Sequence, residues 1–231
     1  MILAFETSAK AASVALMQDG ILLGESYQNT GLTHSQTLMC MAESLLAQCN
    51  CTVEQIDAVA VAAGPGSFTG VRIGVAAAKG FAWGRRIPCY GASTLEAMAL
   101  NLGIYEGTVC AVMDARRNQV YNALFKAEKG VLTRICEDRA ISIEELKAEL
   151  PDGPVYLVGD GSKLCKQHIP EAILPPEHRQ HQRAAGVALA AEAMITRGES
   201  GDANALTPNY LRLSQAERER AERERTGKTG K

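Results

Sequence analysis

Hydrophobic and polar positions alternate along the first part of the chain in a pattern that predicts three strands. Residues 1–7 and 12–18 both read as strands. Asp19 and Gly20 then form a hairpin turn into a third strand at 21–27. These three segments predict a small antiparallel sheet at the start of the fold.

The pattern becomes helical after the third strand. Thr33 and Gln36 have the spacing of a capping box. The apolar stripe behind them consists of Leu38, Met41, Leu45 and Cys49. The next predicted elements are a strand at 57–63, a helix of small residues to about residue 85, a strand at 87–92 and a helix at 94–102. Three hairpin-connected strands followed by alternating helices and strands indicate an RNase H-like α/β unit.

The same order of elements begins again at about residue 108. Its predicted members are strands at 108–114, 119–126, 131–136 and 154–158, a helix capped by Ser142 and Glu145, and a helix at 184–197. We therefore predict an N-terminal domain at 1–103 and a C-terminal domain at 104–213. The remaining residues, 214–231, repeat Ala-Glu-Arg-Glu-Arg and have no apolar face, so we expect a charged, solvated appendage.

Composition excludes several classes of protein. The 231 residues are 46% hydrophobic, which suits compact domains, and a net charge of −2 gives no general attraction to nucleic acid or anionic membranes. No apolar run reaches the ~18 residues of a membrane span. The first residues lack the basic region of a signal peptide, so we expect a cytoplasmic protein without membrane contact. The seven cysteines include no CxxC pair, which favours reduced thiols over a metal site.

The glycine-rich segment at 64–74 is the strongest candidate for a binding site. A strand end followed by glycines and a helix start can hold a phosphate, because backbone amides and the helix dipole favour an anion. The segment matches neither a Walker A motif nor GxGxxG, so a purely structural turn stays open. Gly70, Gly74 and Ala78 then recur at helical spacing. Because each helical glycine costs roughly 0.5–1 kcal/mol, we expect close helix packing, either on a partner or within the domain.

Seven segments together resemble the TsaB family, also called YeaZ. They are ILAFETS at 2–8, AASVAL at 11–16, THS at 33–35, GPGSFTGVRIG at 64–74, IPCYGASTLEAMA at 87–99, MDARRNQVY at 113–121 and PNYLR at 208–212. The resemblance implies an actin-like ATPase fold with two RNase H-like domains. It also implies a role in adding threonylcarbamoyl to the adenosine next to the anticodon in tRNAs that read codons beginning with A. The implied partners are the catalytic subunit TsaD and the ATPase TsaE, which use a threonylcarbamoyl-adenylate made elsewhere.

The resemblance further implies that this chain is not an enzyme. In TsaD, the corresponding segment carries His-x-x-x-His, two ligands of an active-site metal. Thr94 and Met98 fall at those positions here, and a hydroxyl and a thioether are poor ligands for a hard cation. We therefore expect no metal and no tightly bound cofactor in the isolated chain. ATP and metal are expected only together with TsaD and TsaE.

The loops that would hold a nucleotide in an actin-type ATPase are altered in this chain. Glu6 stands where an aspartate is usual, and Arg116 follows Asp114 where a glycine would let backbone approach phosphate. At most, we expect vestigial phosphate contacts from Glu6, Thr7, Ser8, Gly64, Gly66, Ser67, Asp114, Gly159 and Gly161. The alternative is an independent small-molecule kinase or ATPase of the actin-like fold. A metallopeptidase is disfavoured because the chain has no HExxH motif.

The resemblance places the partner interface on the helices at 33–49 and 70–84. In the family these helices build a four-helix bundle with TsaD, and the same surface is expected to form a homodimer of the isolated chain. The expected interface residues are His34, Leu38, Met41, Leu45, Gly70, Arg72, Gly74, Ala77, Ala78 and Phe81. Contact with tRNA is expected through the complex.

Overall fold

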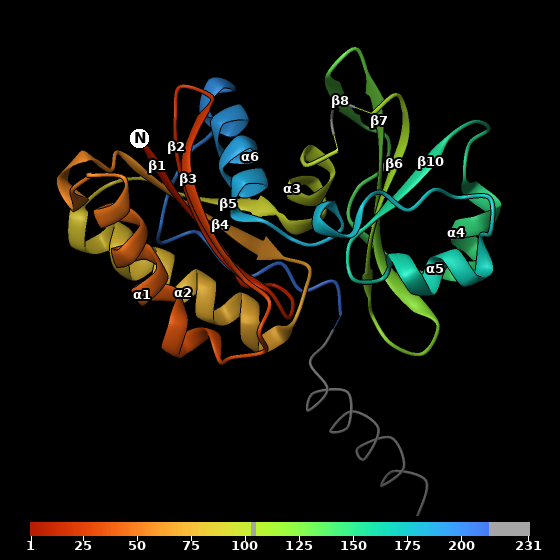
Figure 1. The fold of residues 1–231 in the computed structure, drawn as a ribbon, viewed down its shortest axis with the longest axis horizontal. Coiled ribbons are helices and arrows are strands. Elements are labelled where there is room, and N and C mark those ends of the chain that lie inside the picture. The colour runs from red at the N-terminus through yellow and green to blue at the C-terminus, as the bar shows by residue number, and fades with distance from the viewer. Residues whose placement is uncertain (103–104, 213–231) are drawn as a thin grey trace, which may run out of the picture.

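The computed structural model describes residues 1–102 and 105–212, which form two α/β lobes side by side (Figure 1). The first lobe contains a five-stranded sheet in the order β3-β2-β1-β4-β5. Its strands are β1 (Ile2–Glu6), β2 (Ala12–Gln18), β3 (Ile21–Gln28), β4 (Ala58–Gly64) and β5 (Cys89–Ser93). β2 runs antiparallel to β1, whereas β4 runs parallel to it. This order confirms the predicted RNase H-like arrangement.

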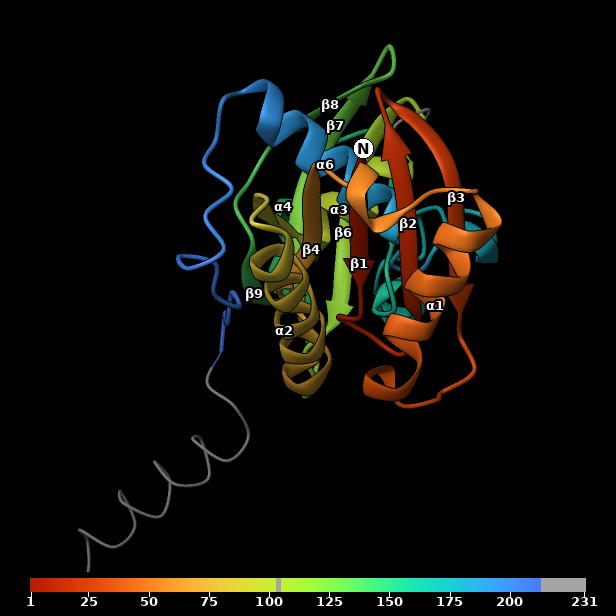
Figure 2. The same cartoon turned by 90° about the vertical axis from the view of Figure 1, so that its left-hand side faces the viewer.

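Helices cover both faces of the first sheet because its central strands alternate between two cores. Leu3 and Phe5 of β1 pack with α1 (His34–Gln48) and α2 (Phe68–Arg85) on one face. Ile2 and Ala4 pack with α6 (Ala184–Thr196) on the other face (Figure 1). A short 3-10 helix, Val53–Gln55, joins α1 to β4. Figure 2 shows α1 and α2 lying side by side across the outer face.

The position of α6 corrects the predicted domain boundary. The sequence order assigned this helix to the domain at 104–213, but its alanines pack against strands of the first sheet. Arg183, just before the helix, pairs with the nearly buried carboxylate of Glu25 on β3, and the amide of Ala185 donates to the same carboxylate at 3.2 Å. The chain therefore returns to the first lobe after building the second.

The second lobe is a smaller version of the first. Its strands are β6 (Gly107–Asp114), β7 (Gln119–Glu128), β8 (Val131–Arg134), β9 (Arg139–Ser142) and β10 (Val155–Val158). They follow the order β10-β6-β7-β8, and β9 also pairs with β7. The strand β9 was not predicted. Helices α4 (Ile143–Glu149) and α5 (Ser162–His168) cover one face, and the 3-10 helix Glu177–Arg179 follows.

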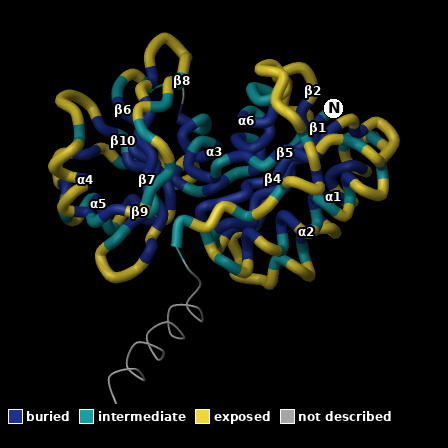
Figure 3. Tube along the Cα trace, turned by 180° about the vertical axis from the view of Figure 1, so that it is seen from behind, coloured by how far each residue is buried: buried dark blue, intermediate teal, exposed yellow. Residues whose placement is uncertain are grey.

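Helix α3 (Thr94–Leu100) lies between the two lobes and joins their cores (Figure 1). Ala97 faces α6, and a side chain at Gly186 of that helix would collide with the Ala97 carbonyl. Leu95 and Met98 pack instead with β6 and β7 of the second lobe. Buried residues accordingly run through the central strands of both lobes and through α3 (Figure 3). Among the described helices, none is long and apolar enough to cross a membrane.

Candidate functional site

The carboxyl ends of strands from both lobes converge on one cleft. The residues after β1 and β4 come from the first lobe, and those after β6 and β10 from the second. The cleft has a volume of about 660 Å³. Ligands of open α/β sheets bind outside the carboxyl ends of strands, so this is the expected place for a nucleotide. Of the predicted phosphate-loop residues, Ser8, Gly66, Ser67 and Asp114 line it directly.

The glycine-rich loop at the start of α2 packs on the turn after β1. The Ser67 amide donates to the Ser8 carbonyl at 2.6 Å, and the Ser67 hydroxyl caps α2 by accepting from the Gly70 amide. A side chain at Gly66 would lie 2.6 Å from the Ser8 carbonyl. The glycine at 66 is therefore explained by contact within the chain. The sequence left open whether this segment is a purely structural turn, and that interpretation accounts for its geometry.

The glycine stripe of α2 faces its own sheet. The Thr7 hydroxyl, just beyond β1, donates to the Gly70 carbonyl at 2.8 Å. An added Cβ at Gly70 would collide with the Thr7 carbonyl, and one at Gly74 would collide with the Thr7 hydroxyl. Ala78 is fully buried one turn further along. The close approach that these glycines permit is therefore to β1 of the same lobe.

This packing corrects the predicted partner interface. Six of the ten proposed residues are buried within the first lobe, namely Leu38, Met41, Leu45, Gly70, Gly74 and Ala78. His34 is partly exposed, and its Nε2 donates to the Ala9 carbonyl at 2.8 Å. Arg72 is exposed, whereas Ala77 and Phe81 are partly exposed. The periodicity in the sequence was correct, but it marked the inner face of each helix.

The outer face of α2 carries the predicted Arg72 together with three residues that the sequence prediction missed, Ala76, Gly80 and Trp83. Arg72, Ala76, Gly80 and Trp83 are exposed at helical spacing, two positions away from the buried stripe. Trp83 is 55% exposed, and Met39 on the neighbouring α1 is 46% exposed. Among the described residues, no atom outside the adjoining backbone of α2 lies within 4 Å of a Cβ built at Gly80 or Gly84. These two glycines have no packing role within the described chain.

Glu6 forms part of the buried floor of the first lobe at the end of β1. Its Oε1 accepts from the Ser8 amide at 2.6 Å, whereas its Oε2 has no partner among the described residues. Burial raises the pKa of Glu6 to about 7, an effect that its hydrogen bonds with Ser8 oppose and the nearby Asp160 reinforces. The carboxyl group therefore changes its protonation state near neutral pH.

Glu6→Gln should make stability less dependent on pH. The pKa is raised in the folded state, so ionisation favours unfolding as pH rises from 4.5, the ordinary value, to about 7. This difference corresponds to roughly 3 kcal/mol, absent below pH 4.5 and complete above pH 7. In urea unfolding, the variant should gain stability relative to the wild type between pH 5 and pH 8. A difference in stability between variant and wild type that stays constant with pH would contradict this assignment. Glu43→Gln, at an exposed position of α1, serves as the control.

The loop after β6 is held by a hydrogen bond within the second lobe. Asp114 Oδ1 accepts from the Arg116 amide at 2.7 Å. Arg116, Arg117 and Asn118 all have left-handed backbone conformations, with φ of 64°, 56° and 54°, which non-glycine residues adopt only at an energetic cost. Arg116 lines the cleft where an actin-type loop needs a glycine. The substitution of arginine for the usual glycine at position 116, noted in the sequence, therefore places a positive charge and a strained turn beside the cleft.

The loop after β10 also packs on the second lobe itself. Gly159 has φ +111°, and a side chain there would collide with the Val112 carbonyl. The Gly161 amide donates to that same carbonyl at 3.2 Å. The carboxylate of Asp160 accepts from Gln182 at 3.3 Å, and desolvation raises its pKa. Both glycines of this predicted vestigial loop thus have structural roles.

A C-terminal strap, residues 206–212, passes across the mouth of the cleft. The Asn209 amide donates to the Ala63 carbonyl at 2.6 Å. Tyr210 stacks on Phe68 with 4.8 Å between ring centroids. Arg212 then reaches the second lobe, where it donates to the Ala115 carbonyl at 2.9 Å. In the sequence analysis, residues 208–212 appeared only as one of the segments that carry the family resemblance. The contacts of the strap were not predicted, because they join residues far apart along the chain.

Thr94 and Met98 lie in the core between the lobes. Both side chains are fully buried. The Met98 sulfur would be 3.0 Å from a Cβ at Gly159, so it fills the space beside that loop. Within residues 1–102 and 105–212, no group of three or more His, Cys, Asp or Glu side chains is arranged to hold a metal ion. These two positions on α3 therefore contribute to lobe packing.

Two RNase H-like lobes around a shared cleft define an actin-like ATPase fold. A family model described as TsaD: tRNA N6-adenosine threonylcarbamoyltransferase matches residues 28–219. The tRNA threonylcarbamoyladenosine biosynthesis protein TsaB of Bacillus subtilis is 33% identical over 225 residues, covering 94% of this chain and 96% of that protein. The chain belongs to the TsaB family, which confirms the family resemblance.

Further comparisons agree with this membership. The TsaB protein of Haemophilus influenzae is 40% identical over 173 residues, covering 69% of this chain and 72% of that protein. The solved structure of YeaZ from Pseudomonas aeruginosa has a TM-score of 0.78 at 26% identity, covering 91% of this chain and 99% of that one. The similarity therefore extends over both lobes.

Proposed function

We propose that this chain is a non-catalytic subunit of the machinery that forms threonylcarbamoyladenosine in tRNA. The proposal is supported by the TsaB protein of Bacillus subtilis, which is named for threonylcarbamoyladenosine biosynthesis and aligns with 94% of this chain. The absence of catalysis is supported by Thr94 and Met98, which are buried between the lobes at the positions of the expected metal ligands. The cleft loops support it as well, because their glycines serve contacts within the chain.

The outer face of α2 is the proposed docking surface for TsaD. Gly80 lies in the interior of an exposed helix, where glycine costs about 1 kcal/mol relative to alanine, and nothing in the described chain packs against it. A partner helix could approach its backbone closely and offset this cost. Exposed Trp83 lies about one turn further along α2, and Met39 is exposed on the neighbouring α1, so both helices offer large apolar contacts. This unpacked glycine is the observation that carries the docking proposal.

The same face would join two copies of the chain when TsaD is absent. A self-complementary surface related by a two-fold axis is the commonest form of homodimer. TsaE, ATP and a metal would then act on the complex with TsaD, and tRNA would be bound by that complex. In this proposal the chain holds TsaD in a productive arrangement and contributes no reacting group.

Gly80→Arg should abolish docking. An arginine at this position would keep a partner helix at a distance and bury an unpaired charge, so the affinity for TsaD should fall at least about 100-fold, or about 3 kcal/mol. Titration by calorimetry measures this directly. Ala148→Arg, on exposed α4 of the second lobe, is the matched control and should bind like the wild type. Unchanged affinity of the Gly80 variant would remove this surface from the proposal.

A further inference from the structure

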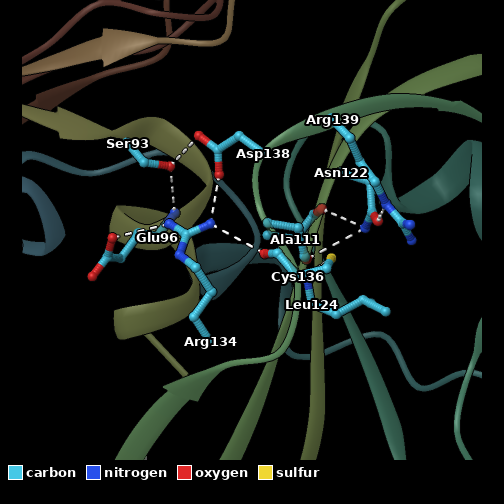
Figure 4. Close-up of polar contacts among 10 residues, drawn as sticks. Ser93, Glu96, Ala111, Asn122, Leu124, Arg134, Cys136, Asp138 and Arg139 are labelled. Atoms are coloured by element: carbon cyan, nitrogen blue, oxygen red, sulfur yellow. Dashed lines mark hydrogen bonds and ion pairs between the residues drawn. The ribbon is translucent and has the colours of Figure 1, made fainter.

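Four polar side chains connect the two lobes next to helix α3 (Figure 4). They line a second cavity of about 570 Å³. Arg134, the last residue of β8, donates to Glu96 of α3 at 3.0 Å and to Asp138 at 2.8 Å. Asp138 also accepts from the hydroxyl of Ser93, the last residue of β5, at 2.6 Å. These residues, Ser93, Glu96, Arg134 and Asp138, are named the interlobe clamp. Two come from the first sheet and α3, and two from the second lobe.

The hydrogen bonds and ion pairs of the interlobe clamp have fixed directions. The planar guanidinium of Arg134 divides its donors between two carboxylates and also lies over the Phe125 ring, 4.7 Å from the centroid. The Asp138 side chain is only 9% exposed. Ser93 accepts from the Glu96 amide as the N-cap of α3 while it donates to Asp138. Each group is therefore held by at least two others.

The C-terminal strap provides a second polar contact between the lobes. Arg212 donates to the Ala115 carbonyl of the second lobe. The strap itself is fixed to the first lobe by Asn209 and by Lys79, which donates to the Leu206 carbonyl at 2.9 Å. Asn209 lines both the cleft and the cavity beside the interlobe clamp. The interlobe clamp therefore lies at the end of β5, and the strap lies at the end of β4.

Apolar packing of α3 against both lobes does not by itself fix their angle. Hydrophobic contact is non-directional, so packed faces can slide, whereas paired ions and hydrogen bonds specify a geometry. We propose that the interlobe clamp and the strap together hold the lobes at one relative orientation, so that the cleft does not open and close. The chain then presents its docking helices and its second lobe to a partner as one rigid body.

A distance measurement between the lobes tests this proposal. Spin labels attached through a non-canonical keto amino acid at Glu43 of α1 and Lys147 of α4 avoid the native cysteines. Both sites are exposed and lie on different lobes. Pulsed electron paramagnetic resonance of the wild type should give a single narrow distance. Arg134→Met, which keeps contact with Phe125 but removes both ion pairs, should broaden the distribution or add a second distance.

Arg139→Met is the matched control, because the partners of Arg139 lie in its own lobe. It pairs with Glu149 at 2.6 Å. It also donates to Asn122 at 3.2 Å (Figure 4). This variant should keep the narrow distance. If Arg134→Met does not fold, Asp138→Asn combined with Ser93→Ala removes the hydrogen bond between Ser93 and Asp138 and the charge of Asp138 with little change in volume, and it should broaden the distribution. The proposal is overturned if the folded clamp variants stay as narrow as the wild type, or if Arg139→Met broadens equally.

Discussion

Gly70→Val is expected to destabilise the first lobe strongly. A Cβ at this position would collide with the Thr7 carbonyl, which is backbone, and the position of the Cβ is itself fixed by the backbone of α2. The helix cannot move away without breaking the hydrogen bond from Thr7 to Gly70 and opening the core beneath α2. The loss should be at least about 4 kcal/mol, against a total stability of about 5–15 kcal/mol for a typical domain. Circular dichroism and urea unfolding measure it.

Gly80→Ala is the matched control on the same helix. A Cβ there contacts no described atom outside the adjoining backbone of α2, so the variant should gain about 0.5–1 kcal/mol from the higher helix propensity of alanine. If Gly70→Val lowers the stability and Gly80→Ala raises it, the loss at Gly70 comes from its close packing against β1. It does not come from a general sensitivity of α2 to substitution. A stable Gly70→Val protein would show that this account of the inner face is wrong.

Depletion of this chain in its own cells should remove almost all threonylcarbamoyladenosine from tRNA. If the chain holds TsaD in its productive arrangement, the catalytic subunit alone would have little activity. Mass spectrometry of nucleosides from digested tRNA measures the level. Re-expression of the wild type or of Ala148→Arg should restore the modification, whereas Gly80→Arg should not. An unchanged level after depletion would eliminate the proposed pathway.

The sequence predicted the positions of the helices, except for α5, better than it predicted which face of each helix is buried. The stripe of Gly70, Gly74 and Ala78 correctly indicated close packing, but a sequence pattern does not say whether the neighbour belongs to the same chain. The neighbour is Thr7, which lies more than sixty positions earlier. Once β1 is known to occupy that face, the exposed positions follow at an offset of two residues, at Arg72, Ala76 and Gly80.

Contacts between distant segments were the part that sequence reasoning could not supply. Helix α6 follows the second lobe in sequence, yet its alanine-rich surface packs on the first sheet. The interlobe clamp brings Arg134 to Glu96, 38 positions earlier, and no local pattern marks either residue. The antiparallel pairing of β1, β2 and β3, in contrast, was predictable because hairpin turns and alternation are local signals.

Reconstituted transfer is the most direct test of the claim that this chain supports catalysis without performing it. Purified chain, TsaD, TsaE, ATP, divalent metal, threonylcarbamoyl-adenylate and unmodified tRNA should together produce threonylcarbamoyladenosine. Omission of TsaD should abolish the product, and Gly80→Arg in this chain should reduce it to the level seen without the chain. Modification of tRNA by this chain in the absence of TsaD would contradict the account.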